Sequence, residues 1–411
     1  MLVSKTKIVY LSYLFFIMAF SIRGCYLLPT EFSIFGLTLR IICLGINLGF
    51  CILVAYQYGV SLLIEKVDGW FLFSIVLAVI GTVMAYFSYN QPMISTFLIQ
   101  MYIFSYTLLF IPIRKLIDRK IISYYDLKNL VYVFGIILLV LLCLQFFFRN
   151  NIQLLNVTVL ERYGGARYYL DSSYIALLIA IAIGEIIKRK RIVFNSIIVL
   201  AGIFVEVNMI KSRAIMIALI FSLLITVLVV RQVSWKKVLI SIICFAGAVY
   251  FFNYTEMGID TISSIMEADT SLSIRQAARN FYLNKFWENP FWGSGYVDSY
   301  YSMSAKLSGQ NQGFYYVDNG IWGILFYYGI IGILWSIGGI VPRIFESVKE
   351  ARNNGEGFPI FYIIYICALL NTVQFDFFRA RMGFTLYALL LYCINQRNEE
   401  DIRKVQMGDV R

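Results

Sequence analysis

Five arginines in this sequence stand where turns or helix starts are expected, and their chemistry suits a phosphate anion. Arg162 and Arg167 flank a Gly-Gly pair, which allows backbone to approach a ligand closely. Arg213 lies in a very short turn, and Arg275 and Arg279 are four residues apart, so that both project from one helix face. A guanidinium stays charged, and its planar fork matches phosphate oxygens. The alternative interpretation is that these are ordinary solvated arginines.

Asp318 and Asn319 precede a long apolar run in a chain that contains no histidine. A carboxylate whose pKa is raised by partial burial can act as the general base that histidine usually provides. The alternative is that Asp318 caps a helix whose first residue is Asn319 or Gly320, because Asp is a favoured cap residue. The two roles do not exclude each other. Asp298 and Glu288 are the reserve candidates for a base.

The elements that carry these residues belong to an all-α, polytopic membrane protein. Of the 411 residues, 60% are hydrophobic and 14% are charged, and the mean hydropathy is +0.74, whereas a globular chain carries about 25% charged residues. Apolar stretches of roughly 20 residues recur, each long enough to cross a bilayer, and their continuous pattern favours helices over a barrel. We expect a single integral membrane domain, residues 1–411, with about twelve spans: 8–23, 35–58, 70–88, 93–112, 129–148, 172–187, 192–209, 213–230, 237–252, 319–341, 358–374 and 382–396.

The Lys and Arg residues indicate how the chain is oriented. Twenty-two of the 35 lie on one side of the predicted membrane and twelve on the other, with Arg40 inside a span; the first group includes those at the N-terminus, at 114–120, at 188–191, at 231–237 and in the C-terminal tail. The positive-inside rule makes that side cytoplasmic, with both termini. The net charge of +11 is therefore mostly a topology signal, and no basic soluble face remains for nucleic acid. The seven cysteines show no metal-ligand spacing.

The largest segment outside the spans is the predicted extracytoplasmic loop 253–318, which contains an amphipathic helix over about 272–287. Six apolar residues recur there at helical spacing: Ile274, Ala277, Ala278, Phe281, Tyr282 and Phe286. Asn289 before Pro290 ends the helix. We expect its apolar face to lie on the bilayer, which would hold Arg275 and Arg279 over a cavity. The glycines of the following "NPFWGSG" are interpreted as turn residues.

Two further extracytoplasmic positions bear on an anion site. Asp171 or Ser172 is expected to cap the helix that follows the smaller loop, 149–171, and the positive end of that helix dipole suits an anion. Arg213 is expected at membrane depth or one turn from it, facing a polar cavity, unless it snorkels to the interface. Glu206 is its candidate partner in either case.

The order of these motifs resembles the bacterial O-antigen polymerase and O-antigen ligase superfamily of membrane glycosyltransferases. An Arg-Gly loop opens one helix, "SRA" opens another, an arginine precedes "NPFWGSG" in a long loop, and an Asp-Asn pair precedes a helix with "YYGIIGILW". The resemblance covers residues 160–340 and matches Arg162, Arg213 and Arg275 to arginines of the family. Members often have His-Asn where this chain has Asp-Asn. This departure weakens any transfer of the histidine's role and favours the polymerase branch.

The resemblance implies a donor glycan on polyprenyl diphosphate at the outer face of a bacterial inner membrane. Diphosphate is already a good leaving group, so the reaction needs charge stabilisation more than a strong acid. The predicted catalytic residues are Asp318, Arg275 and Arg213, and the predicted substrate-binding residues are Arg162, Arg167, Arg279 and Asn319. No cofactor or metal is expected, because the outer carboxylates are scattered. The implied partners are membrane lipid, lipid-linked oligosaccharides, a chain-length regulator and a flippase.

Other functions remain open at this point. An O-antigen ligase would use the same donor but a lipid-anchored core sugar as acceptor. A lipid-linked oligosaccharide flippase would also suit twelve spans and internal arginines. Flippases of that kind have two similar halves and short loops, whereas this chain has one long loop and no detectable repeat. A purely structural membrane protein is the weakest alternative.

Overall fold

Helices make up most of the chain that the structure describes. The computed structural model describes residues 2–29, 32–34, 37–59, 66–149, 152–162, 165–230, 270–298, 301–316, 319–370 and 382–408, with single positions at 247, 250, 254, 258 and 259. The helices are α1 Leu2–Ser21, α2 Leu39–Tyr58, α3 Lys66–Tyr89, α4 Met93–Ile99, α5 Met101–Asp118, α6 Tyr124–Phe148, α7 Ser173–Ile187, α8 Ile192–Val205, the π-helix η1 Glu206–Ile210, α9 Arg213–Val229, α12 Thr270–Glu288, α13 Ser302–Leu307, the short 3₁₀-helix η2 Gln310–Gln312, α14 Ile321–Asn354, α15 Gly357–Leu369 and α16 Met382–Gly408.

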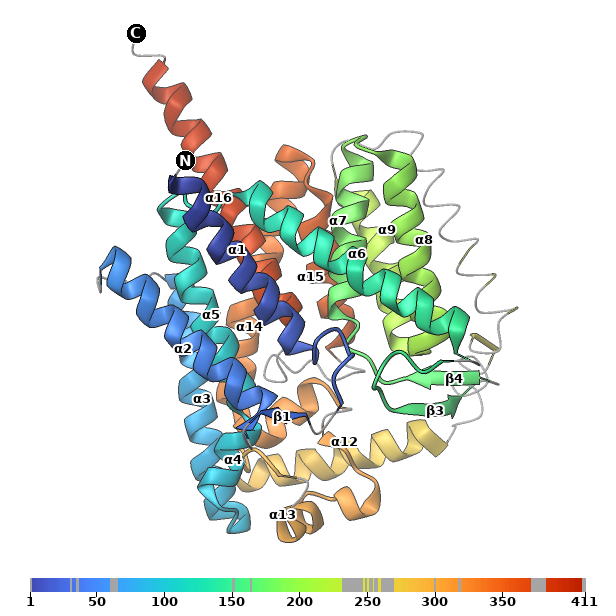
Figure 1. Cartoon of the computed structure of the whole chain (residues 1–411). Helices are drawn as coiled ribbons and strands as arrows, with labels where there is room; N and C mark the ends of the chain where they lie inside the picture. Colours follow the sequence, from blue (N-terminus) through green and yellow to red (C-terminus); the bar gives the residue numbers. More distant parts are fainter. Residues whose placement is uncertain are drawn as a thin grey trace.

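Two small antiparallel hairpins interrupt the helices. Strands β1 (Ser33–Ile34) and β2 (Leu37–Thr38) form the first, and β3 (Val159–Arg162) and β4 (Gly165–Tyr168) form the second. Figure 1 shows both chain termini at one end of the molecule, with α12, α13 and the β3–β4 hairpin toward the other end.

The described helices overlap the predicted spans, but fewer than twelve of them are long and apolar enough to cross a bilayer. Among the described residues, five helices are long and apolar enough to span a bilayer: α2, residues 69–89 of α3, α6, α8 with η1, and α14. A sixth is possible only if α4 and residues 103–118 of α5, bent by 51°, form one span. Helices α7, α9 and α15 are apolar but shorter. The expectation of about twelve spans stays a prediction, and span 237–252 lies almost wholly outside the described residues.

The centre of the molecule is formed by α7, α15 and the first half of α16. Side chains of α7 are buried from Ser173 to Gly184, and most of α15 is buried too, because these helices are apolar on all sides. Outer helices instead keep apolar side chains exposed, including Ile52 of α2, Val79 of α3 and Leu334 of α14. Such outward apolar faces are expected for helices that contact lipid.

A pair of tryptophans fixes α3 along α14. The rings of Trp70 and Trp335 stack with centroids 4.4 Å apart. Each indole N–H donates to the other residue's carbonyl, at 2.8 and 2.9 Å. Gly339 permits this contact, because a Cβ there would clash with the Trp70 ring. The contact fixes the position of α3 along the axis of α14. Both helices contact the glycine-containing segment after α12 that is described below.

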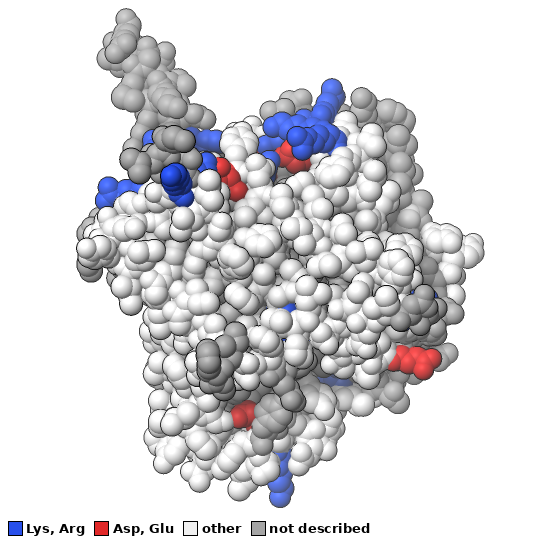
Figure 2. All heavy atoms as spheres, in the orientation of Figure 1, with Lys and Arg blue, Asp and Glu red and all other residues white. Residues whose placement is uncertain are grey.

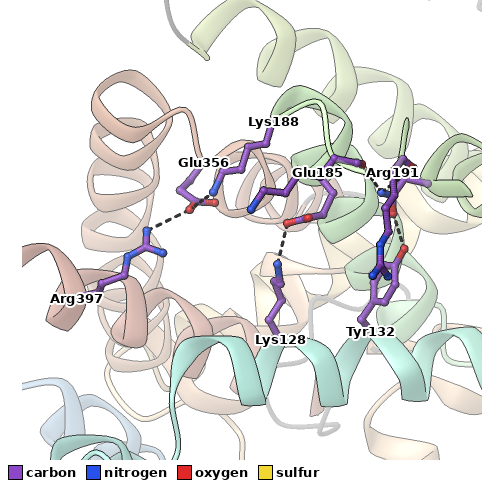
Figure 3. A network of polar contacts seen from close by, with 9 residues as sticks. Lys128, Tyr132, Glu185, Lys188, Arg191, Glu356 and Arg397 are labelled. Atoms are coloured by element: carbon purple, nitrogen blue, oxygen red, sulfur yellow. Dashed lines mark hydrogen bonds and ion pairs between the residues drawn. The ribbon is translucent and has the colours of Figure 1, made fainter. Parts of the chain in front are cut away.

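Cations gather at the end that carries the termini, as Figure 2 shows, while much of the surface below them on this face is uncharged. Figure 3 shows a network there that joins four helices. Lys128 of α6 binds Glu185 of α7 at 2.8 Å. Glu356, before α15, binds both Lys188 and, at 3.3 Å, Arg397 of α16. A basic end next to the termini is what the positive-inside interpretation requires, and the orientation itself stays a prediction.

Candidate active site

The β3–β4 hairpin brings Arg167 to the turn before Arg213. The Arg167 Nε–H donates to the carbonyl oxygen of Ile210 at 3.2 Å, and its guanidinium lies 4.7 Å from the centre of the Tyr169 ring. Ile210 ends η1, and Arg213 begins α9 three residues later, half-buried. Arg162 ends β3 opposite Gly165, and its side chain lies outside the described residues. Two of the predicted arginines therefore meet at one turn.

The hairpin is held in place by a left-handed turn at residues 23–26. All four residues have φ between 53° and 64°, a conformation that costs about 1–2 kcal/mol for each residue with a side chain. The Tyr26 hydroxyl accepts the Asp171 N–H at 2.7 Å, and the Tyr26 carbonyl accepts the Asn156 N–H at 2.8 Å. The Asn156 side chain adds a bond to the Leu27 carbonyl at 2.7 Å. Both ends of the hairpin segment are thus tied to the same turn, which the sequence analysis missed.

One of the two residues predicted to cap α7 does so. The Asp171 carboxylate accepts the Ser173 N–H at 2.8 Å. Ser172 does not cap the helix, and its hydroxyl instead pairs with the Tyr365 hydroxyl of α15 at 3.0 Å. Asp171 is therefore the capping side chain.

Helix α12 is present where the sequence predicted it, and it ends before Asn289 and Pro290. The expectation that its apolar face lies on the bilayer is wrong. Ala278, Tyr282 and Phe286 are buried, and the Tyr282 ring lies 4.8 Å from the Phe326 ring of α14. The apolar face packs against protein because α14 offers an aromatic surface of its own. Ile274, expected on the same face, is 45% exposed.

Arg275 and Arg279 lie one helical turn apart on α12, and both are half-buried. Burial, and then the neighbouring charge of Arg275, lower the pKa of the Arg279 guanidinium below its ordinary value. Two like charges held close together favour an anion between or beside them. This is the electrostatic setting that a diphosphate would relieve.

Residues 290–295, which follow α12, form hydrogen bonds to α14 at the point where that helix is interrupted. Gly329 interrupts α14 with φ 62° and ψ −155°. Three backbone bonds cover the break: Ser294 N–H to the Phe326 carbonyl at 2.7 Å, Gly295 N–H to the Tyr327 carbonyl at 3.2 Å, and Ile330 N–H to the Pro290 carbonyl at 2.9 Å.

Gly293 and Gly295 permit this close approach to neighbouring backbone. A Cβ on Gly293 would lie 2.6 Å from the Gly329 nitrogen, and one on Gly295 would clash with the backbone of Ala85 in α3. Their φ angles of 70° and 88° also favour glycine. The interpretation of these glycines as turn residues alone was incomplete. They join α12 and α14 into one support for the candidate site.

Asn319 is buried at the start of α14. It is 1% exposed, and its Nδ2 donates to the Tyr315 carbonyl at 2.8 Å. Its Oδ1 is buried and has no hydrogen-bond partner among the residues that the structure describes. A buried acceptor without a donor is costly, and such exceptions call for a functional explanation.

Asp318 lies outside the described residues, but the residues beside it bear on its alternative role. Helix α14 begins at Ile321, and Gly320 stands in the cap position with φ 53°. Neither Asn319 nor Gly320 is the first helical residue, so the expectation that Asp318 is the N-cap is not met. The base or acceptor-orienting role of Asp318 stays a prediction.

The starts of α7 and α14 meet at one end of α15. The Ile321 N–H donates to the Leu370 carbonyl at 2.9 Å, just after α15. One turn earlier in α15, Tyr365 pairs with Ser172 at the start of α7. The buried amide of Asn319 and the capped start of α7 beneath the hairpin therefore belong to the same end of the molecule.

The reserve carboxylates are engaged elsewhere. Glu288 is 57% exposed and pairs with Lys285 at 2.8 Å, so it lacks the dry setting that would make it a base. Asp298 is 7% exposed, its carboxylate accepts the Ser95 hydroxyl of α4, and its backbone N–H donates to the Gln91 side-chain oxygen at 2.9 Å. Glu206 is buried in η1, and its pairing with Arg213 stays a prediction.

Comparison with known protein families finds a match for part of the chain. No curated protein matches the chain. Residues 197–336 match the family described as O-antigen ligase. The matched range contains η1, α9, α12, the glycine segment and the broken start of α14, and it leaves out the β3–β4 hairpin. The match supports the placement of this chain in the O-antigen ligase and polymerase superfamily.

Proposed function

We propose that this chain is a membrane polysaccharide polymerase, which transfers a growing glycan from polyprenyl diphosphate to a sugar hydroxyl of a lipid-linked repeat unit. Family membership supports membrane glycosyl transfer of the ligase or polymerase type. One observation carries the proposal further: the separate segments that contain the arginines, namely the hairpin, the start of α9 and α12, lie toward the end of the molecule away from the termini (Figure 1). Such a set suits a diphosphate head group on one side of a membrane.

In the proposed reaction the acceptor hydroxyl oxygen forms a bond to the anomeric carbon of the donor. The bond from that carbon to the diphosphate oxygen breaks, and polyprenyl diphosphate leaves with the electron pair. Arg213, Arg275 and Arg162 stabilise the charge that develops on the leaving group, with Arg167 and Arg279 as secondary contacts. The hydroxyl proton passes to the Asp318 carboxylate.

Asn319 suits the acceptor side of this reaction. Its Oδ1 is a buried acceptor without a donor among the described residues, and a sugar hydroxyl is a donor of the right kind. The Nδ2 bond to Tyr315 fixes which way the amide faces. We propose that Asn319 orients the acceptor sugar while the neighbouring carboxylate takes its proton.

Glycan analysis of a deletion strain, with the wild-type gene restored as control, tests the proposal. Loss of a polymerase leaves single repeat units on the cell surface. Loss of a ligase leaves long polymers on polyprenyl diphosphate and none on the lipid core. Loss of a flippase leaves no outer glycan at all. A surface polymer ladder of normal length in the deletion strain would exclude the polymerase.

The ligase reaction is the second candidate, because the matched family is described as O-antigen ligase. The donor and the role of the arginines would be the same. Purified protein separates the two reactions: a polymerase forms a ladder from lipid-linked repeat units alone, whereas a ligase forms product only when a lipid-anchored core is added.

A further inference from the structure

Three large aromatic side chains at the end of α12 are exposed although the apolar face of that helix is buried. Trp287 is 71% exposed, Phe291 65% and Trp292 48%. They fall within six residues, and none takes part in the candidate site. Isolated exposed apolar residues need no explanation. Three large aromatic side chains that are exposed within six residues of the chain indicate an interaction surface.

The place of these residues in the fold indicates what covers them. The Pro290 carbonyl binds the Ile330 N–H, and the Phe291 carbonyl lies against Gly329. The aromatic group therefore stands beside α14 at the point where its outward apolar face begins. That face continues along the helix through four exposed residues: Ile330, Leu334, Ile337 and Val341.

This outward face of α14 belongs to a candidate membrane span. From Ile330 to Val341 it covers about 17 Å at 1.5 Å per residue, a little over half of a hydrocarbon core of about 30 Å. The aromatic group continues the face toward the end of the molecule that carries α12. Tryptophan is enriched at membrane–water interfaces, where its ring lies at the level of the head groups.

We propose that Trp287, Phe291 and Trp292 form an interfacial anchor, which inserts into the lipid leaflet on the side away from the chain termini. The anchor provides a contact with lipid at this end of α12, whereas the apolar face of α12 is buried against protein. It fixes the C-terminal end of α12 at head-group level, and the exposed Lys285–Glu288 pair beside it faces the polar layer. The inference depends on the outward face of α14 and not on the proposed reaction.

Quenching of tryptophan fluorescence by brominated lipids tests the anchor. The full chain is placed in nanodiscs of phosphatidylcholine brominated near the head group, brominated near the acyl terminus, or unbrominated. The signal of Trp287 and Trp292 is obtained by subtracting the spectrum of the W287F/W292F variant. We expect this difference signal to be quenched strongly by the shallow bromines and weakly by the deep ones.

The matched control is Trp335→Phe, because Trp335 is 5% exposed and stacked on Trp70 inside the protein. Its difference signal should be less quenched by either lipid than that of the aromatic group. A difference signal from Trp287 and Trp292 that no brominated lipid quenches would overturn the proposal. So would shallow-bromine quenching that appears only after a dimer, followed by mass photometry, is dissociated, because a second copy would then cover the surface.

Discussion

At the end of the molecule that carries both termini, lysine and arginine side chains are held by carboxylates, whereas arginines at the opposite end lie beside a backbone carbonyl, an aromatic ring and one another. Glu356, with its side chain 3% exposed, binds Lys188 and Arg397 across three segments (Figure 3). Toward the other end, Arg167 donates to the Ile210 carbonyl, and burial, followed by the charge of Arg275, lowers the pKa of Arg279.

This difference separates two uses of positive charge. Carboxylate partners neutralise a cation and tie helices together, so the charge at the first end serves the fold. A carbonyl or an aromatic ring orients a guanidinium, as the Ile210 carbonyl and the Tyr169 ring do for Arg167, and we propose that the arginines at the second end serve to attract an anion. The ion pair Lys285–Glu288 near the second end is exposed, and such pairs contribute little.

The comparison depends first on the two ends facing opposite sides of a membrane. A reporter fused at residue 305, within α13, is expected outside, while reporters at either terminus are expected in the cytoplasm. The outcome is all-or-none, measured with paired periplasmic and cytoplasmic reporters. If residue 305 were cytoplasmic, these arginines could not bind the diphosphate, because the head group of the proposed donor lies on the outer side of the membrane.

The next largest effect is expected at Asp318. Asp318→Asn and Asp318→Ser should lower polymerisation by about 10²–10⁴-fold, the usual contribution of a general base, and leave single repeat units at normal protein levels. Asn caps a helix about as well as Asp, so a capping role predicts a silent Asn variant. The control is Glu288→Gln, at an exposed carboxylate that should be dispensable. A normal polymer ladder from Asp318→Asn would exclude the base.

Lysine substitutions compare the two ends directly. Arg162→Lys, Arg213→Lys and Arg275→Lys keep the charge but lose the bidentate fork, so each should reduce polymerisation by up to about 10²–10³-fold, the cost of one preorganised donor. Arg397→Lys is the matched control, because a lysine can still pair with Glu356. Full activity in all three outer variants, measured as polymer formed per protein, would contradict the assignment of these arginines to the diphosphate.

Much of this arrangement can be predicted from sequence because it depends on local pattern. Apolar periodicity indicates α12, Pro290 marks its end, and Asp171 is a recognisable cap. The order of the arginines also indicates their chemistry without any coordinates.

Other features could not be predicted because they depend on distant partners. Periodicity shows that α12 has an apolar face but not that Phe326 covers it. The run around Gly329 has the composition of a continuous helix, and its break is stabilised by the distant segment 290–295. Likewise, the left-handed residues 23–26 are held by bonds to Asn156 and Asp171, far along the chain.

A more modest effect is expected when a carboxylate is removed at the first end. Glu356→Gln should lower the free energy of unfolding by about 1–3 kcal/mol. The loss should stay below the 3–5 kcal/mol typical of a fully buried pair, because the Lys188 and Arg397 side chains are 25% and 32% exposed. Thermal unfolding in detergent should show a lower midpoint, with polymerisation per folded protein unchanged. A loss of activity without a loss of stability would show that this end also serves the reaction.

The smallest effect is expected at Tyr26, where a hydroxyl far from the ion pairs supports the arginine hairpin. Tyr26→Phe removes the bond to the Asp171 N–H and leaves in place the bonds from the Asn156 N–H to the Tyr26 carbonyl and from the Asn156 side chain to the Leu27 carbonyl, so the stability loss should be about 1 kcal/mol. Because the hairpin carries Arg162 and Arg167, the KM for the lipid-linked donor should rise several-fold while kcat changes less. Tyr10→Phe is the matched control, since Tyr10 lies in α1, the helix before this turn, is also buried and bonds Gln57 of α2 instead. It should lose similar stability without a change in KM. Equal KM values for the two variants would mean that the strained turn supports the fold alone and that the arginines of the hairpin are positioned by other contacts.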